Sequence, residues 1–366
     1  MKDSFFGLVF GSKIKSNAVE ADFVEEGERE AGFAEFYSQK IKSDNIRLEN
    51  IRVKNLKYLI LSSRISLILG IILTIFTFIA TSSEIYQVST KQHQDLFRNI
   101  VLGVFIILII WPSIFTIIYK NAIKSDLFKN IFSFFGEFIY EPGGSKSLGS
   151  YEQFQLLPAY DVKFSTSEDY VVGTYKGVNI SFEEACLQKE TRTKQGTSIN
   201  FGKVHLGRGA GGRQEVKTEV KFKGILITLS FNKNFKGRTI VRTDRKIDNL
   251  VRGVTDSLER VELEDPEFEK MFQVYSQDQV EARYLLTTSF MERLKSLSVF
   301  FESERTEASF YENKVLLTFV GTQNLFEPRS IFEQTDLVKE CKNVIAQMGL
   351  IFDVIDHLKL DQRTGL

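Results

Sequence analysis

The sequence predicts an α+β protein held in a membrane by a helical hairpin. Residues 100–119 are twenty consecutive residues without a charge, which at about 1.5 Å per residue matches a hydrocarbon core of roughly 30 Å. Residues 59–81 are interrupted only by Arg64, close enough to the start of the run for its guanidinium to reach the headgroups. After these two runs come short alternating segments joined by turn residues, which predict an antiparallel sheet with packed helices.

The charges that flank the two runs predict their orientation. Basic residues precede the first run and follow the second: Lys40, Lys42, Arg47, Arg52, Lys54 and Lys57, then Lys120, Lys124 and Lys129. The loop between the runs is balanced, with Lys91 and Arg98 against Glu84 and Asp95. Positive loops stay in the cytoplasm, so both termini are expected there. No cleavable signal is evident, and the first run is expected to serve as the insertion signal.

Four regions follow from this layout. Residues 1–57 form a cytoplasmic N-terminal helical segment, residues 58–119 the transmembrane hairpin, residues 120–147 a membrane-proximal amphipathic helix and linker, and residues 148–366 a cytoplasmic α+β domain. In the first region, apolar residues at helical spacing predict a seam through which the chain forms a homo-oligomer: Ala34, Tyr37, Ile41, Leu48 and Ile51. The helix expected at residues 126–140 either lies in the membrane interface or is a core helix of the cytoplasmic domain.

Strands and helices of the last region are predicted from alternation and periodicity. Hairpins are expected for residues 170–175 with 178–182, 220–231 with 238–242, and 306–311 with 314–320. Helices are expected at residues 150–156, 266–272, 277–286, 289–299 and 336–360. Strands grouped by hairpins favour one antiparallel sheet; the alternative is two small α+β subdomains divided near residues 244–253.

Composition restricts the chemistry. Cys186 and Cys341 are far apart and the three histidines are scattered, so the sequence predicts a reducing compartment, no metal centre and no cofactor. Residues 189–246 hold fifteen Lys and Arg against four acids, and residues 256–312 fourteen acids against six bases. The two segments either neutralise each other or leave the basic one to contact a partner.

A glycine-rich loop lies inside the basic segment, at residues 202–213. Its spaced glycines satisfy the dinucleotide pattern, but the polar residues before it and the strand-like alternation after it do not give the strand and helix that this pattern needs. Two interpretations remain: a surface loop between strands, or an anion-contacting loop. In the second, the cations would meet lipid headgroups or an acidic protein, with nucleic acid the less favoured partner: Lys194, Lys203, Arg208 and Arg213.

An acidic run at residues 262–269 has a plainer interpretation than a metal site. Its carboxylates lack the spacing and turn glycine of a calcium loop. Pro266 directly after Asp265 is typical of the first turn of a helix, so these acids are expected to lie at a helix N-terminus.

Residues 261–294 resemble the signature of an uncharacterised bacterial family known only as a domain of unknown function. The resemblance rests on the LEDPEFEKMFQVYSQDQVEARYLLTTSFMERL stretch, on Glu168, Asp169, Tyr170 and Gly173, and on Phe222, Lys223 and Gly224. It implies two N-terminal membrane helices, one cytoplasmic domain and a bacterial inner membrane. It implies no activity and no functional residue.

The sequence contains no nucleophile elbow and no metalloprotease helix. The expected function is therefore a membrane-tethered interaction module, whose cytoplasmic domain binds a macromolecular partner or the anionic membrane surface. The alternative is an enzyme that acts at the cytoplasmic face with dispersed catalytic residues.

Overall fold

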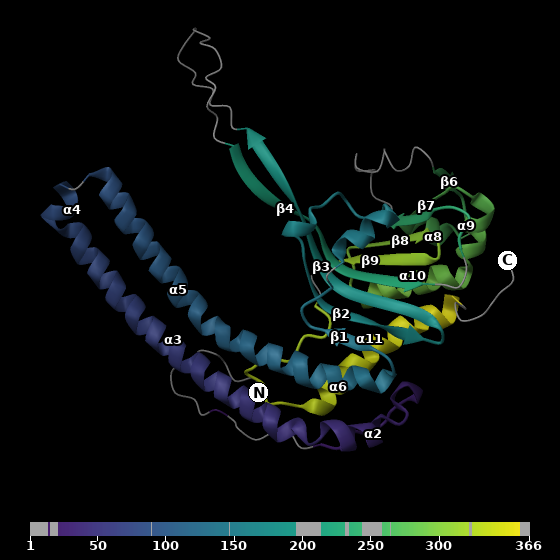
Figure 1. Ribbon diagram of the computed structural model, residues 1–366, viewed down its shortest axis with the longest axis horizontal. Coiled ribbons are helices and arrows are strands. Elements are labelled where there is room, and N and C mark those ends of the chain that lie inside the picture. The colour runs from purple at the N-terminus through teal and green to yellow at the C-terminus, as the bar shows by residue number, and fades with distance from the viewer. Residues whose placement is uncertain are drawn as a thin grey trace, which may run out of the picture. The chain divides into compact units, whose positions relative to one another are not determined.

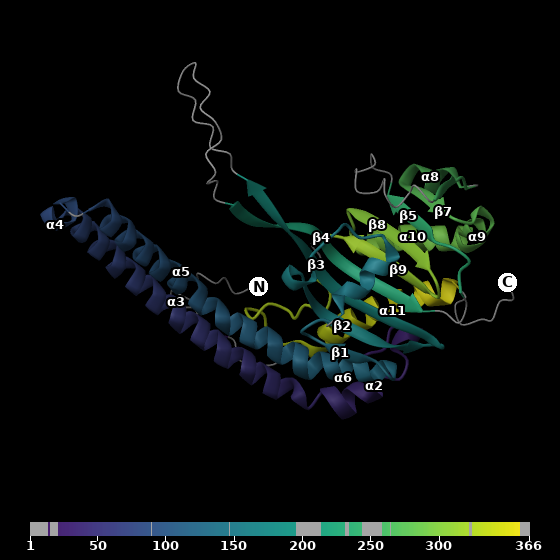
Figure 2. The same ribbon diagram turned by 45° about the horizontal axis from the view of Figure 1, so that its top comes forward.

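A computed structural model describes residues 14, 21–88, 90–145, 147–194, 214–230, 234–243, 258–263, 265–321 and 324–358. The chain divides into two compact units. The first consists of residues 1–135 and 326–346, and the second of residues 136–325 and 347–366. Figures 1 and 2 show the elements of each unit in two views.

The first unit is built on two long apolar helices. Helices α3 (Asp44–Ser82) and α5 (Lys91–Ile123) are joined through α4 (Glu84–Val88) and lie side by side in both views (Figures 1 and 2). They run antiparallel, since Tyr58 stacks on Phe115 near one end, at 5.5 Å between ring centroids, and Phe76 meets Phe97 near the other. Both are long and apolar enough to cross a membrane. The predicted helical hairpin is confirmed as a fold.

The helical path continues past α5 but ends earlier than predicted. A π-turn (η3, Lys124–Phe128), α6 (Lys129–Phe132) and a 3-10 turn (η4, Ser133–Phe135) follow. Tyr140, predicted to be helical, lies instead in strand β1 (Ile139–Glu141). The apolar face is buried at Leu127, Phe128, Ile131 and Phe132. Residues 126–135 therefore belong to the core of the first unit, and not to the α+β unit in which a core helix was the second interpretation.

The N-terminal segment packs within the same unit. It forms η1 (Glu28–Glu30), α2 (Phe33–Phe36) and η2 (Tyr37–Ile41). Phe33 meets Phe134 edge to face at 4.7 Å, and Tyr37, Ile41 and Leu48 are buried. Three residues of the predicted apolar seam are therefore buried within the chain itself.

The second unit contains an antiparallel sheet, which confirms the predicted α+β class. Among the described residues its strand order is β1-β2-β3-β4-β9-β8-β5-β7-β6. The strands after β1 are β2 (Thr166–Tyr175), β3 (Val178–Lys194), β4 (Gln214–Ser230), β5 (Thr239–Thr243), β6 (Glu259–Val261), β7 (Phe272–Ser276), β8 (Arg305–Tyr311) and β9 (Lys314–Val320). All pairings among these strands are antiparallel.

Two of the three predicted hairpins are confirmed and one is wrong. Strands β2 and β3 turn at Lys176 and Gly177, both with positive φ as a primed turn requires, and β8 pairs with β9. Strand β4 does not pair with β5: β4 lies between β3 and β9, and β5 between β8 and β7. The connection crosses the β8–β9 turn, where the Phe235 amide donates to the Glu312 carbonyl at 2.6 Å, and so reaches the far side of that hairpin.

The core lies on both faces of the central strands. On one face the 3-10 segment η5 (Leu148–Phe154) packs against Leu187, Phe222, Leu226 and Leu316. On the other, α10 (Thr288–Phe300) places Phe290 on Phe310 at 5.5 Å, and Phe301 just after it contacts Phe319 at 4.6 Å. The remaining elements of this unit are η6 (Val162–Phe164), α8 (Pro266–Met271) and α9 (Gln279–Leu285).

Helix α11 (Leu337–Leu358) belongs to both units, its first ten residues to the first and the rest to the second. In the second unit Phe352 stacks on Tyr175 at 4.1 Å and contacts Phe138 at 5.7 Å. Lys176 forms an ion pair with Asp356 at 2.6 Å.

Candidate functional site: a buried charge cluster at the base of the hairpin

An irregular segment, residues 326–336, follows the sheet in sequence but belongs to the first unit. We call it the inserted segment. It has no helix or strand, yet Phe326, Ile331 and Thr335 are buried, and Phe326 meets Phe132 of α6 at 5.1 Å. A buried segment without regular structure must satisfy its backbone groups by side-chain hydrogen bonds, and charged residues of α3 provide several of these bonds.

Arg52 of α3 is the first of these residues. Arg52 is 1% exposed and Glu49 is 2% exposed. The Arg52 guanidinium donates two hydrogen bonds to the Glu49 carboxylate, of 2.8 and 2.6 Å. Its third nitrogen donates to the Ile331 carbonyl at 2.9 Å, while Glu49 accepts from the Thr335 amide at 3.1 Å. A buried pair holds its charges only when further hydrogen bonds satisfy them. Here the inserted segment supplies those bonds.

Glu327 makes the corresponding contact with the other helix. It pairs with Lys120 of α5 and, at 2.8 Å, with Lys124, which is itself buried. Burial alone would raise the pKa of Glu327, but the hydrogen bonds from Lys120 and Lys124 outweigh it and hold the pKa below its usual value. The inserted segment is thus tied to both long helices by charge.

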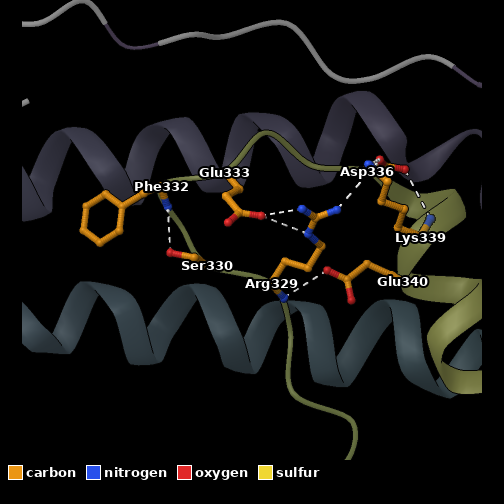
Figure 3. Close-up of polar contacts among 7 residues, drawn as sticks. All are labelled: Arg329, Ser330, Phe332, Glu333, Asp336, Lys339 and Glu340. Atoms are coloured by element: carbon orange, nitrogen blue, oxygen red, sulfur yellow. Dashed lines mark hydrogen bonds and ion pairs between the residues drawn. The ribbon is translucent and has the colours of Figure 1, made fainter. Parts of the chain in front are cut away.

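A second cluster lies around Arg329, as Figure 3 shows. The guanidinium bonds Glu333, with Nε 3.1 Å from Oε2, and approaches Asp336 at 3.8 Å. The Arg329 amide donates to Glu340 of α11 at 3.0 Å, and Asp336 also pairs with Lys339 at 3.0 Å. Glu333 and Asp336 therefore share the guanidinium, Asp336 also pairs with the Lys339 ammonium, and Glu340 is held by the backbone of Arg329.

Glu340 is the member of this cluster with the most altered acidity. Burial raises its pKa to about 7, and the charges of Asp336 and Glu333 add to the rise, while the Arg329 amide and guanidinium oppose it. The carboxyl therefore gains and loses a proton near neutral pH, whereas ordinary glutamates are ionised there.

Phe332 of the inserted segment also lines a groove between the two long helices. The groove has a volume of about 700 Å³. Apolar side chains line part of the groove. Small or hydroxyl-bearing residues and one proline form much of the rest of its wall: Ser63, Ser66, Gly70 and Thr74 of α3, and Pro112, Ser113 and Thr116 of α5. Several hydroxyls bond their own helix backbone, such as Thr74 to the Gly70 carbonyl at 2.8 Å, so the groove offers mainly an apolar surface.

Two pockets lie among the described residues of the second unit. One, of about 270 Å³, contains Cys186 beside Glu184 and Lys223. The other, of about 250 Å³, lies beside the buried Glu183, which accepts hydrogen bonds from Ser145 and Tyr151. No histidine is among the described residues that line either pocket.

The structure leaves the four predicted anion-contacting residues untested. Lys194 is the last residue of β3. Lys203, Arg208 and Arg213 lie outside the described residues, as does the glycine-rich loop that holds them. Their role stays a prediction.

The acidic run is a helix start, as the sequence predicts. Asp265 caps α8 by accepting from the amides of Glu267 and Phe268 at 2.9 and 3.1 Å, with Pro266 in the first turn. Glu269 accepts from the Leu263 amide at 2.8 Å. The Asp265 carboxylate is therefore the N-cap of α8, and the Glu269 carboxylate binds the backbone just before the helix.

Comparison with known proteins supports the predicted family resemblance. Residues 220–360 match the model of a family described as "Protein of unknown function (DUF3137)". This region runs from β4 to the end of α11 and contains the inserted segment. No curated protein matches the chain.

Among solved structures, the chain aligns with the crystal structure of the mycobacterial trehalose monomycolate transport factor A, TtfA. The TM-score is 0.27 and the identity 10%, over 60% of this chain and 88% of that one. Similarity this low carries no argument about fold or function.

Sequence reasoning missed the charge cluster. It used Arg52 only as a flanking cation, and it left residues 326–335 without a role. The sequence feature that could have indicated this cluster is a group of charged residues among apolar ones, spaced three or four residues apart: Arg329, Glu333, Asp336 and Glu340. Nothing in the sequence shows that residue 335 meets residue 49.

Proposed function

We propose that this protein is a membrane-tethered interaction module of the bacterial inner membrane. Helices α3 and α5 cross the bilayer, both termini face the cytoplasm, and the α+β part binds a partner at the membrane surface. The partner that we favour is the anionic leaflet itself, contacted by the basic segment of residues 189–246.

The observation that carries this proposal is the insertion of residues 326–336 among the ends of the apolar helices. The segment belongs to the region that matches the family, and it is fixed to α3 through Arg52 and to α5 through Glu327. These ion pairs lie within the first unit, where they hold the helix ends and the inserted segment in one buried arrangement. The charged ends of the helices also fit a position just inside the cytoplasmic headgroups, where Lys and Arg are favoured.

The choice of lipid as partner rests on charge and location. A tethered basic segment lies close to a leaflet whose surface potential attracts each Lys or Arg by about 1 kcal/mol within a Debye length. The acidic residues of segment 256–312 compete with the lipid headgroups for the Lys and Arg side chains of segment 189–246. The experiment must therefore separate binding from folding.

The test uses the full chain in nanodiscs of neutral lipid. Reversing Lys194, Lys203, Arg208 and Arg213 to glutamate should reduce its co-flotation with anionic vesicles, and added salt should do the same to the unaltered protein. The control reverses Lys270 and Arg283, two exposed bases of the acidic segment, and should change neither result. Equal co-flotation of both variants, or a lower melting temperature in the fourfold variant, would contradict lipid binding by these residues.

A further inference from the structure

The two longest strands extend past the rest of the sheet. Strand β9 pairs with β4 only over Gly224–Ser230, and β2 pairs with β3 only as far as Cys186. Beyond these points, residues 187–194 of β3 and 214–222 of β4 form a two-stranded ribbon, whose register shifts at a bulge that leaves Lys221 without a partner residue across the ladder. The ribbon projects from the sheet in both views (Figures 1 and 2). We call this ribbon the arm.

The outer edge of the arm on β4 is open. Among the described residues no strand pairs with residues 214–222 on the side away from β3. Residues 216–220 are all exposed, and Val216 and Val220 are 56% and 55% exposed. An isolated ribbon is marginal in water, and an exposed edge with β-branched residues is a ready template for another strand.

The sequence along this edge is complementary to itself. Residues 216–220 read Val-Lys-Thr-Glu-Val, so an antiparallel copy centred on Thr218 places Lys217 opposite Glu219 and Val216 opposite Val220. Because the pairing is symmetric, each of these contacts occurs twice. Opposite charges and β-branched pairs directly across an antiparallel ladder stabilise it, while like charges there oppose it.

We propose that the edge of β4 in the arm pairs with the same edge of a second copy of this protein, antiparallel about Thr218. The interface is isologous, since the same residues serve both subunits under a two-fold axis. It continues the sheet of one subunit into the other, a form of strand addition. The self-complementary charge order makes a second copy a matching occupant, in which the Glu219 carboxylate, 2.7 Å from Lys221 of its own strand, also meets Lys217 of the second copy.

The first measurement is the oligomeric state of the full chain in detergent, determined by mass photometry over a range of protein concentrations. The unaltered protein should dimerise. Lys217→Glu puts Glu against Glu219 twice, and Glu219→Lys puts Lys against Lys217 twice, so each single change should weaken dimerisation at least tenfold. The double variant, Lys217→Glu with Glu219→Lys, restores every opposite pair and should dimerise within about threefold of the unaltered protein.

A mixture of the two single variants gives a sharper result. A chain with Glu at 217 and 219 is complementary at both positions to a chain with Lys at both. The mixture should therefore form heterodimers while each variant alone stays monomeric. This outcome depends on the register, because a pairing shifted by one residue would not bring 217 and 219 together.

A cross-link reports the register directly. With Cys186 changed to alanine and Cys341 buried, Thr218→Cys should join two chains through a short bis-maleimide, whereas Thr174→Cys, an exposed control on β2, should not. A monomeric unaltered protein would overturn the proposal. So would a dimer that ignores both single changes, as one formed through the hairpin or N-terminal helices would, or a folded double variant that stays monomeric.

Discussion

Arg52 is the residue that links the inserted segment to α3. It is buried, paired with Glu49, and bonded to the Ile331 carbonyl. Such a pair adds little net stability compared with apolar residues of the same size, but removing one partner leaves a charge buried without compensation. The arginine is thus required mainly because Glu49 is present.

We expect Arg52→Met to destabilise the first unit by about 3–5 kcal/mol, because Glu49 would be buried without its partner. The double change Glu49→Met with Arg52→Met should recover part of this loss. The measurement is the melting temperature of the detergent-solubilised chain, with Lys57→Met, an exposed position one and a half turns along α3, as control. A single variant as stable as the control would show that the pair is not buried.

Glu340 should make stability depend on pH. The folded state binds its proton with a pKa of about 7, against the ordinary value of 4.5, so stability falls as pH rises from about 4.5 to about 7. Glu340→Gln keeps the acceptor for the Arg329 amide and removes the titration. It should match the unaltered protein near pH 4 and exceed it by about 3 kcal/mol at pH 8.

Melting curves at pH 4, 5, 6, 7 and 8 test this prediction. Glu333→Gln is the matched control, because it neutralises a carboxylate of the same cluster that is less buried. Parallel curves for Glu340→Gln and the unaltered protein at every pH would contradict the assignment of the proton to Glu340.

Elements were predicted from local sequence, and local signals explain both the successes and the failures. The β2–β3 and β8–β9 hairpins have turns of two residues and were found. The link between β4 and β5 also begins and ends with turn residues, but it crosses another hairpin, and that crossing is a long-range contact. Strands β1 and β6 have three residues each, too few for alternation to be visible.

Gly224, part of the Phe222-Lys223-Gly224 motif, shows how one position controls the pairing of two strands. A Cβ at this glycine would lie 2.0 Å from the Phe319 carbonyl oxygen of β9. We expect Gly224→Ala to separate β4 from β9 and to destabilise the sheet by about 3 kcal/mol or more. Gly149→Ala, where the Cβ would sit at an ordinary 3.7 Å from Val162, should be nearly neutral.

Circular dichroism melts of both glycine variants provide the comparison. Equal melting temperatures would mean that β4 and β9 do not approach as closely as described. Loss of folded protein for Gly224→Ala alone would agree with the prediction.

At the scale of the whole molecule, two long apolar runs and the hairpin-rich remainder were enough to predict an α+β protein with an apolar helical hairpin. The candidate site was not predictable in this way. Its decisive contacts join residue 52 to 331, 49 to 335 and 124 to 327, and no spacing rule relates positions so far apart. The acidic helix start at Asp265, in contrast, was predictable because capping acts over three residues.

The proposed topology has two crossings of the bacterial inner membrane and the α+β part in the cytoplasm. The most direct measurement is cysteine labelling in intact spheroplasts with an impermeant thiol reagent. Thr90→Cys, between α4 and α5, should react, and Ser150→Cys, at the start of the α+β part, should react only after lysis. Labelling of Ser150→Cys in intact spheroplasts, or protection of Thr90→Cys, would contradict the account.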